Sequence, residues 1–496
     1  MADPMDKSAD NHTNKFALAS AILASMITII FGYDTGVMSG AMLFMKEELK
    51  INDTQVQVLA GILNLCALVG SLVAGRTSDN IGRRWTIAIA AFLFMVGSVL
   101  MGYGPNFVVL LIGRCAAGIG VGFALMVAPV YSAEIAGAKT RGFLSSLPEL
   151  GIGIGIFLGY IINYFFGKLP LKIGWRLMLG IAAVPSLALL FAIFKMPESP
   201  RWLALKGRLG HAKKVLLKIS NSQEEAEVRL KDIKMAVGID ENCEDDVVKL
   251  PKKGKGEGVW KELLIHPTPT VRRILIAAIG IHFFEHATGI EAVMLYSPRI
   301  FRKAGITQRE KLLLATIGVG GTKVFFLTIA TFILDRVGRR RLLLLSTGGM
   351  ICALAVLGIS LTIADHSKEK LEWALIVSLV ATYAFVACFN SGLGPVTWVY
   401  SSEIWPLKLR AQGAGVGVAV NRLMNAAVSM SFISIYTAIT IGGTFFLFCG
   451  ISAVAWTFFF ICCPETKEKS LEEIEMLFSK HKNRSENTET DPAQNA

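Results

Sequence analysis

Two charged residues lie inside long apolar runs, where a charge is costly unless it has a partner or a function. Asp34 belongs to the run 16–44 and Arg114 to the run 107–135. If both runs are helices that cross a membrane, the two residues lie about 12–15 Å from the same surface. Burial disfavours a carboxylate and a nearby guanidinium favours it, so a changing separation between them could take up and release a proton. We expect a proton-coupling pair; the alternative is a static ion pair.

A second polar group interrupts the apolar run 272–301. Phe284-Glu285-His286-Ala287-Thr288-Gly289-Ile290-Glu291 places two carboxylates and an imidazole within one run. These groups can hydrogen-bond hydroxyl groups, although Glu285 and His286 could instead form an internal structural pair. Lys323 lies near the middle of the run 311–334 and needs a counter-charge, for which Glu285 or Glu291 is the expected source.

Four short patterns occur twice, 256 to 269 residues apart and in the same order. They include Asp-x-x-Gly-Arg-Arg, Tyr-Ser-x-Glu-Ile followed by Lys and Arg, and Pro-Glu-Ser or Pro-Glu-Thr. Because the acid–arginine pairs recur in both halves, we predict that they hold a gate closed. The alternative is that they are ordinary charges at helix ends, which contribute little to stability when exposed. The predicted gating residues are Asp79, Arg83, Arg84, Glu134, Arg141, Asp335, Arg339, Arg340, Glu403 and Arg410, with Gly394 and Pro395 at a helix break.

The repeated motifs resemble those of the sugar porter family of the major facilitator superfamily over roughly 16–480. The form Phe-Glu-His-Ala-Thr-Gly-Ile-Glu departs from the amide-rich pattern of most monosaccharide porters and is similar to the plant polyol (sorbitol or mannitol) transporters. The resemblance implies proton symport through Asp34 and Arg114. By matching position it implies substrate binding by Glu149, Glu285, His286, Glu291, Lys323, Trp398, Asn421 and Asn425.

The elements that must position these residues are apolar helices. The chain has 496 residues, of which 53% are hydrophobic and 18% charged, and a soluble protein would carry nearer a quarter charged residues. Runs of about 20 apolar residues are long enough to cross a bilayer. We therefore predict an all-α membrane protein in two pseudo-symmetric six-helix halves, with spans near 16–44, 55–75, 85–104, 107–135, 143–166, 174–195, 272–301, 311–334, 342–363, 371–400, 410–437 and 442–463.

The net charge of +12 indicates orientation rather than nucleic-acid binding, because the arginines gather in short loops on one predicted side. Those loops and both termini should be cytoplasmic, and the resemblance points to the plasma membrane. The predicted organisation is a tail (1–15), a bundle (16–196), a linker with short helices (197–270) and a second bundle (271–463). A tail (464–496) with a short helix and then a disordered stretch follows. Asn52 starts a glycosylation sequon on the outer side, with occupancy left open.

The leading functional hypothesis is a proton-coupled importer of linear polyols, and of monosaccharides as a further substrate class. The alternatives are a passive facilitator on the same scaffold and a non-transporting sugar sensor. An enzyme is disfavoured, because no nucleophile–base set or metal-ligand spacing stands out. We expect no cofactor or metal, the proton as coupling ion, and a monomer.

Overall fold

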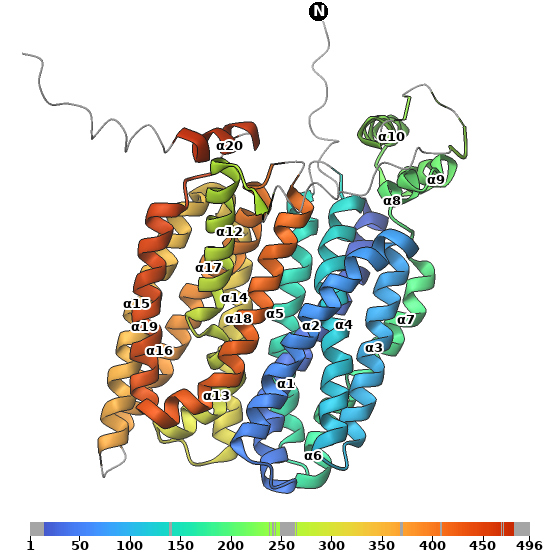
Figure 1. The fold of residues 1–496 in the computed structure, drawn as a ribbon. Coiled ribbons are helices and arrows are strands. Elements are labelled where there is room, and N and C mark those ends of the chain that lie inside the picture. The colour runs from blue at the N-terminus through green and yellow to red at the C-terminus, as the bar shows by residue number, and fades with distance from the viewer. Residues whose placement is uncertain are drawn as a thin grey trace, which may run out of the picture. The chain divides into compact units, whose positions relative to one another are not determined.

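The computed structural model describes residues 14–137, 141–237, 239–240, 243, 245–248, 263, 265–367, 371–406, 409–467, 469 and 471–480. Its elements are helical (Figure 1). A 3₁₀ turn, Ile193–Lys195, follows α7. The helices are α1 Lys15–Glu48, α2 Asp53–Ile81, α3 Arg83–Tyr103, α4 Phe107–Ile135, α5 Arg141–Phe166, α6 Leu171–Gly180, α7 Ala183–Ala192, α8 Pro200–Leu205, α9 Leu209–Ile219, α10 Gln223–Val237, α12 Pro269–Ala287, α13 Ile290–Ala304, α14 Arg309–Val337, α15 Arg339–His366, α16 Glu372–Ser391, α17 Leu393–Glu403, α18 Arg410–Ile439, α19 Ile441–Cys462 and α20 Leu471–Lys480.

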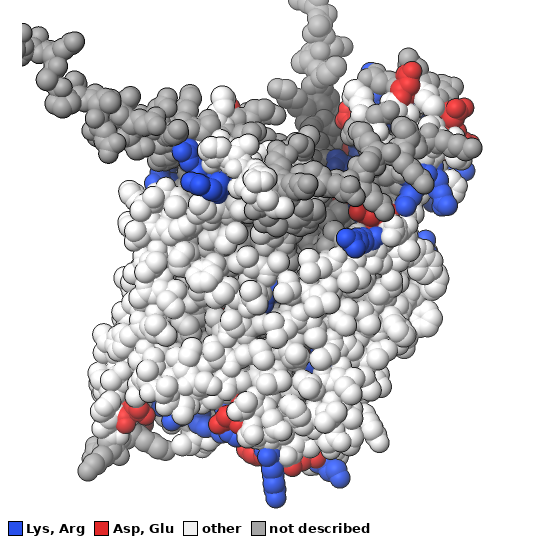
Figure 2. Space-filling view, in the orientation of Figure 1, with Lys and Arg blue, Asp and Glu red and all other residues white. Residues whose placement is uncertain are grey.

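Twelve segments in the described part of the chain are long and apolar enough to cross a membrane, which confirms the predicted number and order. They are Lys15–Glu48, Asp53–Ile81, Arg83–Tyr103, Phe107–Ile135, Ser146–Phe166, Leu171–Lys195, Pro269–Ala304, Arg309–Leu334, Arg339–His366, Glu372–Glu403, Gln412–Ile439 and Ile441–Cys462. Figure 2 shows charged side chains at the helix ends and a mostly uncharged surface between them. Such a surface suits the hydrocarbon layer of a bilayer.

Three of these spans are interrupted. The sixth breaks between α6 and α7, the seventh between α12 and α13, and the tenth between α16 and α17. At the second break Gly289 adopts a φ of 90°, and a Cβ there would overlap the ring of Phe448. Glycine is therefore required where the chain leaves α12 and starts α13. The third break lies at Gly392, just before the Gly394-Pro395 pair that sequence reasoning singled out.

The chain forms two compact units, which we describe separately. Unit 1 comprises Met1–Asp34, Val69–Ile156 and Arg176–Lys253. Unit 2 comprises Thr35–Leu68, Phe157–Trp175 and Gly254–Ala496. Unit 2 thus combines the six C-terminal spans with the end of α1, the beginning of α2, the end of α5 and the beginning of α6. Throughout, the motif end of a unit is the end that carries its Gly-Arg-Arg motif, and the far end is the opposite one.

Short amphipathic helices extend each unit at its motif end (Figure 1). In unit 1, α9 buries Leu209, Ala212, Leu216 and Ile219 while Lys213 and Lys214 are exposed. In unit 2, α20 packs on α12, and Arg273 donates a hydrogen bond to the carbonyl oxygen of Phe478 at 2.7 Å. The expected helices between the halves and after the last span are therefore present.

Candidate functional site

Asp34 and Arg114 form a buried ion pair in unit 1. The Arg114 Nη1 atom lies 2.5 Å from Asp34 Oδ2, and the two side chains are 2% and 4% exposed. Close packing of α1 on α5 encloses the aspartate, because a Cβ at Gly32 would overlap the backbone of Ile152. The predicted proximity of the two charges is confirmed.

Removing Arg114 should damage the protein at least as much as removing Asp34. Arg114→Ala leaves a carboxylate inside the bundle without its counter-charge, which costs about 3–5 kcal/mol for a buried pair. We expect a lower Tm for the purified protein and loss of uptake. Arg272→Ala, at an exposed position in the first turn of α12, is the matched control. A normal Tm and normal uptake for Arg114→Ala would contradict this prediction.

A second buried polar group lies in unit 2, where α12 meets α18. Asn421 donates through Nδ2 to Glu285 Oε2 at 2.6 Å. Arg422 donates through Nε to Asn421 Oδ1 at 2.9 Å, so the amide orients a carboxylate and a guanidinium at once. All three residues are at most 5% exposed. The pairing of Glu285 with Asn421 brings together two residues that the sequence had proposed for substrate binding.

The same polar group extends onto α2. Asn64 donates through Nδ2 to Asn425 Oδ1 at 2.7 Å, and Arg422 Nη1 lies 3.4 Å from Asn64 Oδ1. Asn425 also accepts from Ser429 Oγ at 3.3 Å. Within unit 2, amide side chains of α2 and α18 are thus hydrogen-bonded to each other in the middle of the spans.

His286, Glu291 and Lys323 surround the break between α12 and α13. His286 Nδ1 lies 3.5 Å from Glu291 Oε1, which is beyond a good hydrogen bond. Neither ring nitrogen of His286 has a hydrogen-bond partner among the described residues. Lys323 is 8% exposed and makes no hydrogen bond or ion pair within the described part of the chain. The expected pairing of Lys323 with Glu285 or Glu291 is therefore wrong.

Aromatic residues border this cluster, and one further proposed residue, Glu149, belongs to unit 1. The ring of His282 packs edge-on against Trp398, with ring centroids 5.3 Å apart. His282 is 1% exposed, and its Nδ1 atom lies 3.6 Å from Glu285 Oε2. Glu149 is half-buried in unit 1, directly after Pro148 inside α5.

The first copy of the repeated motifs forms one cluster in unit 1. Arg83 donates through Nε and Nη2 to both oxygens of Glu134, at 3.0 and 3.2 Å, and through Nη1 to Asp79 at 3.2 Å. Glu198 accepts the backbone N–H groups of Arg83 and Arg84 at 2.9 and 3.3 Å. Burial raises the pKa of the Glu198 carboxyl above its ordinary value, and these N–H groups and the Arg83 charge oppose that shift.

The second copy repeats this geometry in unit 2. Arg339 Nη2 donates to Glu403 at 2.8 Å, and Glu465 accepts the backbone N–H groups of Arg339 and Arg340 at 2.9 and 3.2 Å. In each copy the second arginine binds a carbonyl instead, Arg84 that of Phe194 and Arg340 that of Phe460. Arg141, Asp335 and Arg410 lie in helices, but their side chains are outside the described part of the structure.

Glu198 acts as a distant cap for α3. Gly82 precedes that helix with a φ of 101°, and the Glu198 carboxylate occupies the space of a Cβ at Gly82. A carboxylate at a helix N-terminus satisfies unpaired N–H groups and complements the helix dipole. Glu198→Ala should lower the free energy of unfolding by about 1 kcal/mol, and Glu198→Gln by less because an acceptor oxygen remains.

Thermal unfolding of the purified protein checks this prediction. The control is Asp232→Ala, which removes an exposed carboxylate from the second half of α10, away from any helix N-terminus. Glu465→Ala should reproduce the effect at α15. Equal Tm values for Glu198→Ala and the parent would show that the cap contributes nothing.

Sequence reasoning missed Arg422, Asn64 and His282 as members of the buried group, and Glu198 and Glu465 as members of the motif clusters. Arg422 could have been found by the logic that identified Arg114, since it is a lone arginine within an apolar run. The repeated Pro-Glu pattern was noticed, but its glutamates were not included among the gating residues.

Comparison with known proteins decides the family. The model of the family described as "Sugar (and other) transporter" matches residues 20–478. The chain belongs to this family. Probable polyol transporter 6 of Arabidopsis thaliana is 67% identical over 481 residues, covering 97% of this chain and 98% of that protein. Polyol transporter 5 of the same plant is 57% identical, covering 94% and 87%. The protein is thus a multi-pass membrane transporter and not an enzyme.

Solved structures agree with this assignment. The transporter is similar to the proton:xylose symporter XylE of the major facilitator superfamily, with a TM-score of 0.77, 26% identity, and coverage of 94% of this chain and all of that one. An inward-open structure of the E. coli xylose transporter XylE gives a TM-score of 0.75 at 27% identity. The fold is that of the major facilitator superfamily, with twelve spans in two six-helix halves.

Proposed function

We propose that this transporter moves linear polyols across the membrane together with protons, by alternating access. The carrying observation is the set of buried hydrogen-bonding groups near the break between α12 and α13. The side chains of His286 on α12 and Lys323 on α14 have no hydrogen-bond partner among the described residues. The carboxylates of Glu285 and Glu291 lie on α12 and α13, on either side of the break. Buried polar groups that lack protein partners are costly unless a ligand or water satisfies them.

A polyol fits this set because each of its hydroxyl groups can both donate and accept a hydrogen bond. Carboxylate and imidazole can accept, and an ammonium group can donate. The relatives named as polyol transporters support this substrate class. The proposed substrate-binding residues are Glu149, Glu285, His286, Glu291, Lys323, Trp398, Asn421 and Asn425, to which the geometry adds His282 and Arg422.

Proton coupling is proposed to use Asp34, paired with Arg114. The similarity to a protein named as a proton:xylose symporter supports this step. The motif ends carry the repeated arginines, so we place them and both termini on the cytoplasmic side of the plasma membrane. The Arg83–Glu134 and Arg339–Glu403 clusters would then stabilise the helix ends around the inner gate.

Radiolabelled uptake in a transport-deficient host tests the proposal. The host should be assayed at two external pH values with a panel of polyols and hexoses. We expect uptake of linear polyols that rises at the lower pH and collapses when an uncoupler dissipates the proton gradient. Uptake that is indifferent to both treatments would indicate a passive facilitator. Absence of any uptake, with normal amounts of protein at the membrane, would favour a sensor.

A further inference from the structure

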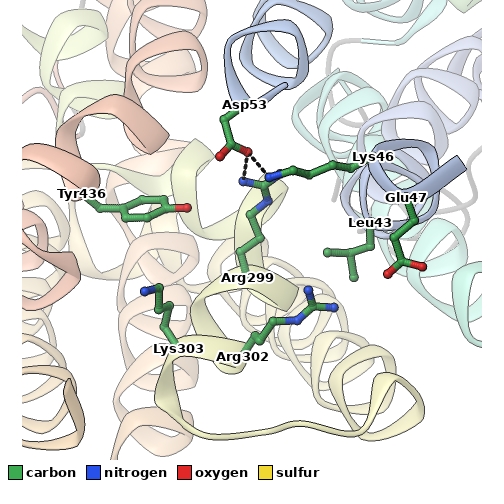
Figure 3. A pocket seen from close by; sticks show the side chains of 8 residues that line it. All are labelled: Leu43, Lys46, Glu47, Asp53, Arg299, Arg302, Lys303 and Tyr436. Atoms are coloured by element: carbon green, nitrogen blue, oxygen red, sulfur yellow. Dashed lines mark hydrogen bonds and ion pairs between the residues drawn. The ribbon is translucent and has the colours of Figure 1, made fainter. Parts of the chain in front are cut away.

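A charged cavity of about 230 Å³ lies at the far end of unit 2 (Figure 3). Four helices contribute to it: α1, α2, α13 and α18. Cationic residues dominate its lining, with four of them against two carboxylates. The lining residues are Leu43, Lys46, Glu47, Asp53, Arg299, Arg302, Lys303 and Tyr436.

Protein cations already occupy both carboxylates of this cavity. Asp53 Oδ1 accepts from Lys46 Nζ at 2.6 Å and from Arg299 Nη1 at 2.9 Å. Glu47 binds Arg309 Nη2 through both of its oxygens, at 2.7 and 2.6 Å. No lining carboxylate is therefore left over for the remaining two cations, Arg302 and Lys303.

Three donor groups remain around the cavity. The side chains of Arg302 and Lys303 are exposed and make no hydrogen bond or ion pair with any residue that the structure describes. The Nη2 atom of Arg299 is buried and likewise has no hydrogen-bond partner in the described part of the chain. Figure 3 shows these three side chains on one stretch of α13, with Lys303 on the side of Tyr436 and Arg302 on the side of Glu47. The Tyr436 hydroxyl points from α18 toward Arg299.

A simpler explanation of the two cations in the last turn of α13 is that they complement the dipole of that helix. That explanation does not account for the buried Nη2 atom of Arg299, which lies one turn earlier. Nor does it account for a cavity bordered by three donors at once. A buried donor without a partner costs free energy, and an anion at this position would recover it.

We propose that this cavity binds a small divalent oxyanion, held by Arg302, Lys303 and the Nη2 atom of Arg299. Several acceptor oxygens on one ligand can each receive a charge-assisted hydrogen bond from these donors. Inorganic phosphate and a short dicarboxylate share this chemistry and fit the volume.

Bound anion should hold the far end of unit 2 together. The cavity exists only while the ends of α1 and α2 lie against α13 and α18, as Asp53 does against Arg299. A ligand stabilises the arrangement to which it binds. If the proposed alternating access is correct, opening at this end separates these helices, so the anion on this side would slow substrate entry. That consequence rests on the proposed function, whereas the binding does not.

Thermal unfolding of the purified full-length protein tests the binding directly. Phosphate and succinate should each raise Tm by about 2 °C at ten times Kd, relative to chloride at equal ionic strength. Arg302→Gln with Lys303→Gln should lose the shift, and the exchange Arg302→Lys with Lys303→Arg should keep it. Lys172→Gln with Lys311→Gln removes the same charge from exposed far-end positions outside the cavity and should also keep it.

Two results would overturn the proposal. One is an anion-induced rise in Tm that is equal in the Arg302/Lys303 and Lys172/Lys311 glutamine variants. The other is no rise in Tm in the parent protein. Polyol uptake measured with phosphate or chloride on the far side supplies the second arm. Inhibition in the parent but not in the Arg302/Lys303 glutamine variant supports the effect on transport. A shift without any polyol uptake would leave the anion site in place and reject the proposed function. Normal polyol uptake without a shift in Tm would reject the anion site and leave the proposed function in place.

Discussion

A transporter with Asp34→Asn is expected to equilibrate its substrate across the membrane but not to accumulate it. The replacement keeps the size of the side chain and removes the group that binds a proton. In the parent, Arg114 Nη1 lies 2.5 Å from Asp34 Oδ2. The amide oxygen of asparagine leaves Arg114 a hydrogen-bond acceptor at this position. With one proton per substrate, each pH unit across the membrane supports roughly tenfold accumulation, and this entire gain should disappear.

The measurement is the steady-state ratio of labelled substrate inside and outside cells, together with exchange of substrate against preloaded substrate. Exchange should persist, because it needs no net proton movement. Asp365→Asn is the matched control, since that aspartate is exposed near the end of α15. Undiminished accumulation by Asp34→Asn would reject a proton role for this residue.

Replacing Glu285 and His286 together by glutamine is expected to shift preference from linear polyols toward pyranoses. A pyranose ring oxygen only accepts hydrogen bonds, and a carboxylate cannot donate to it, whereas a glutamine amide can. Glutamine at 285 also keeps a carbonyl oxygen for Asn421, which donates to Glu285 in the parent at 2.6 Å. We expect the ratio of kcat/KM for a hexose over a hexitol to rise about tenfold.

Competition between the two labelled substrates in the same cells measures this ratio. Glu372→Gln with His366→Gln changes the same residue types at exposed positions and should leave the ratio unchanged. If the Glu285/His286 variant transports both substrates with the parental ratio, these two residues do not set specificity.

Local hydropathy was enough to find the spans, but not their interruptions. Each predicted span overlaps an observed one in the same order. The breaks at Ile181–Ala182, Thr288–Gly289 and Gly392 are too short to change the mean hydropathy of a window of about 20 residues. From the sequence, Gly289 was named only as a member of the polar segment 284–291, without a conformational role. Its positive φ, with Phe448 against it, shows why glycine is needed there.

Partner choice was predictable only where few partners exist. Asp34 and Arg114 are the charges in the cores of their two spans, and estimates of depth placed them together correctly. Lys323 had two carboxylates in reach by the same reasoning, yet it pairs with neither. Glu285 instead accepts a hydrogen bond from Asn421, and Asn421 accepts one from Arg422. Depth along a helix can be counted from the sequence, but rotation about the helix axis cannot.

The sequence by itself determined the membrane-spanning class, the twelve spans that the described residues form and most of the charges buried within them. These features follow from the composition of short stretches of sequence. The hydrocarbon interior of the membrane excludes charged side chains and unpaired backbone groups from every segment that crosses it. Apart from the Asp34–Arg114 pair, only the tertiary structure decided which buried groups touch. Glu285 and Asn421 are 136 residues apart, and Asp53 and Arg299 are 246. Such contacts depend on how distant helices turn and pack, which no local pattern records.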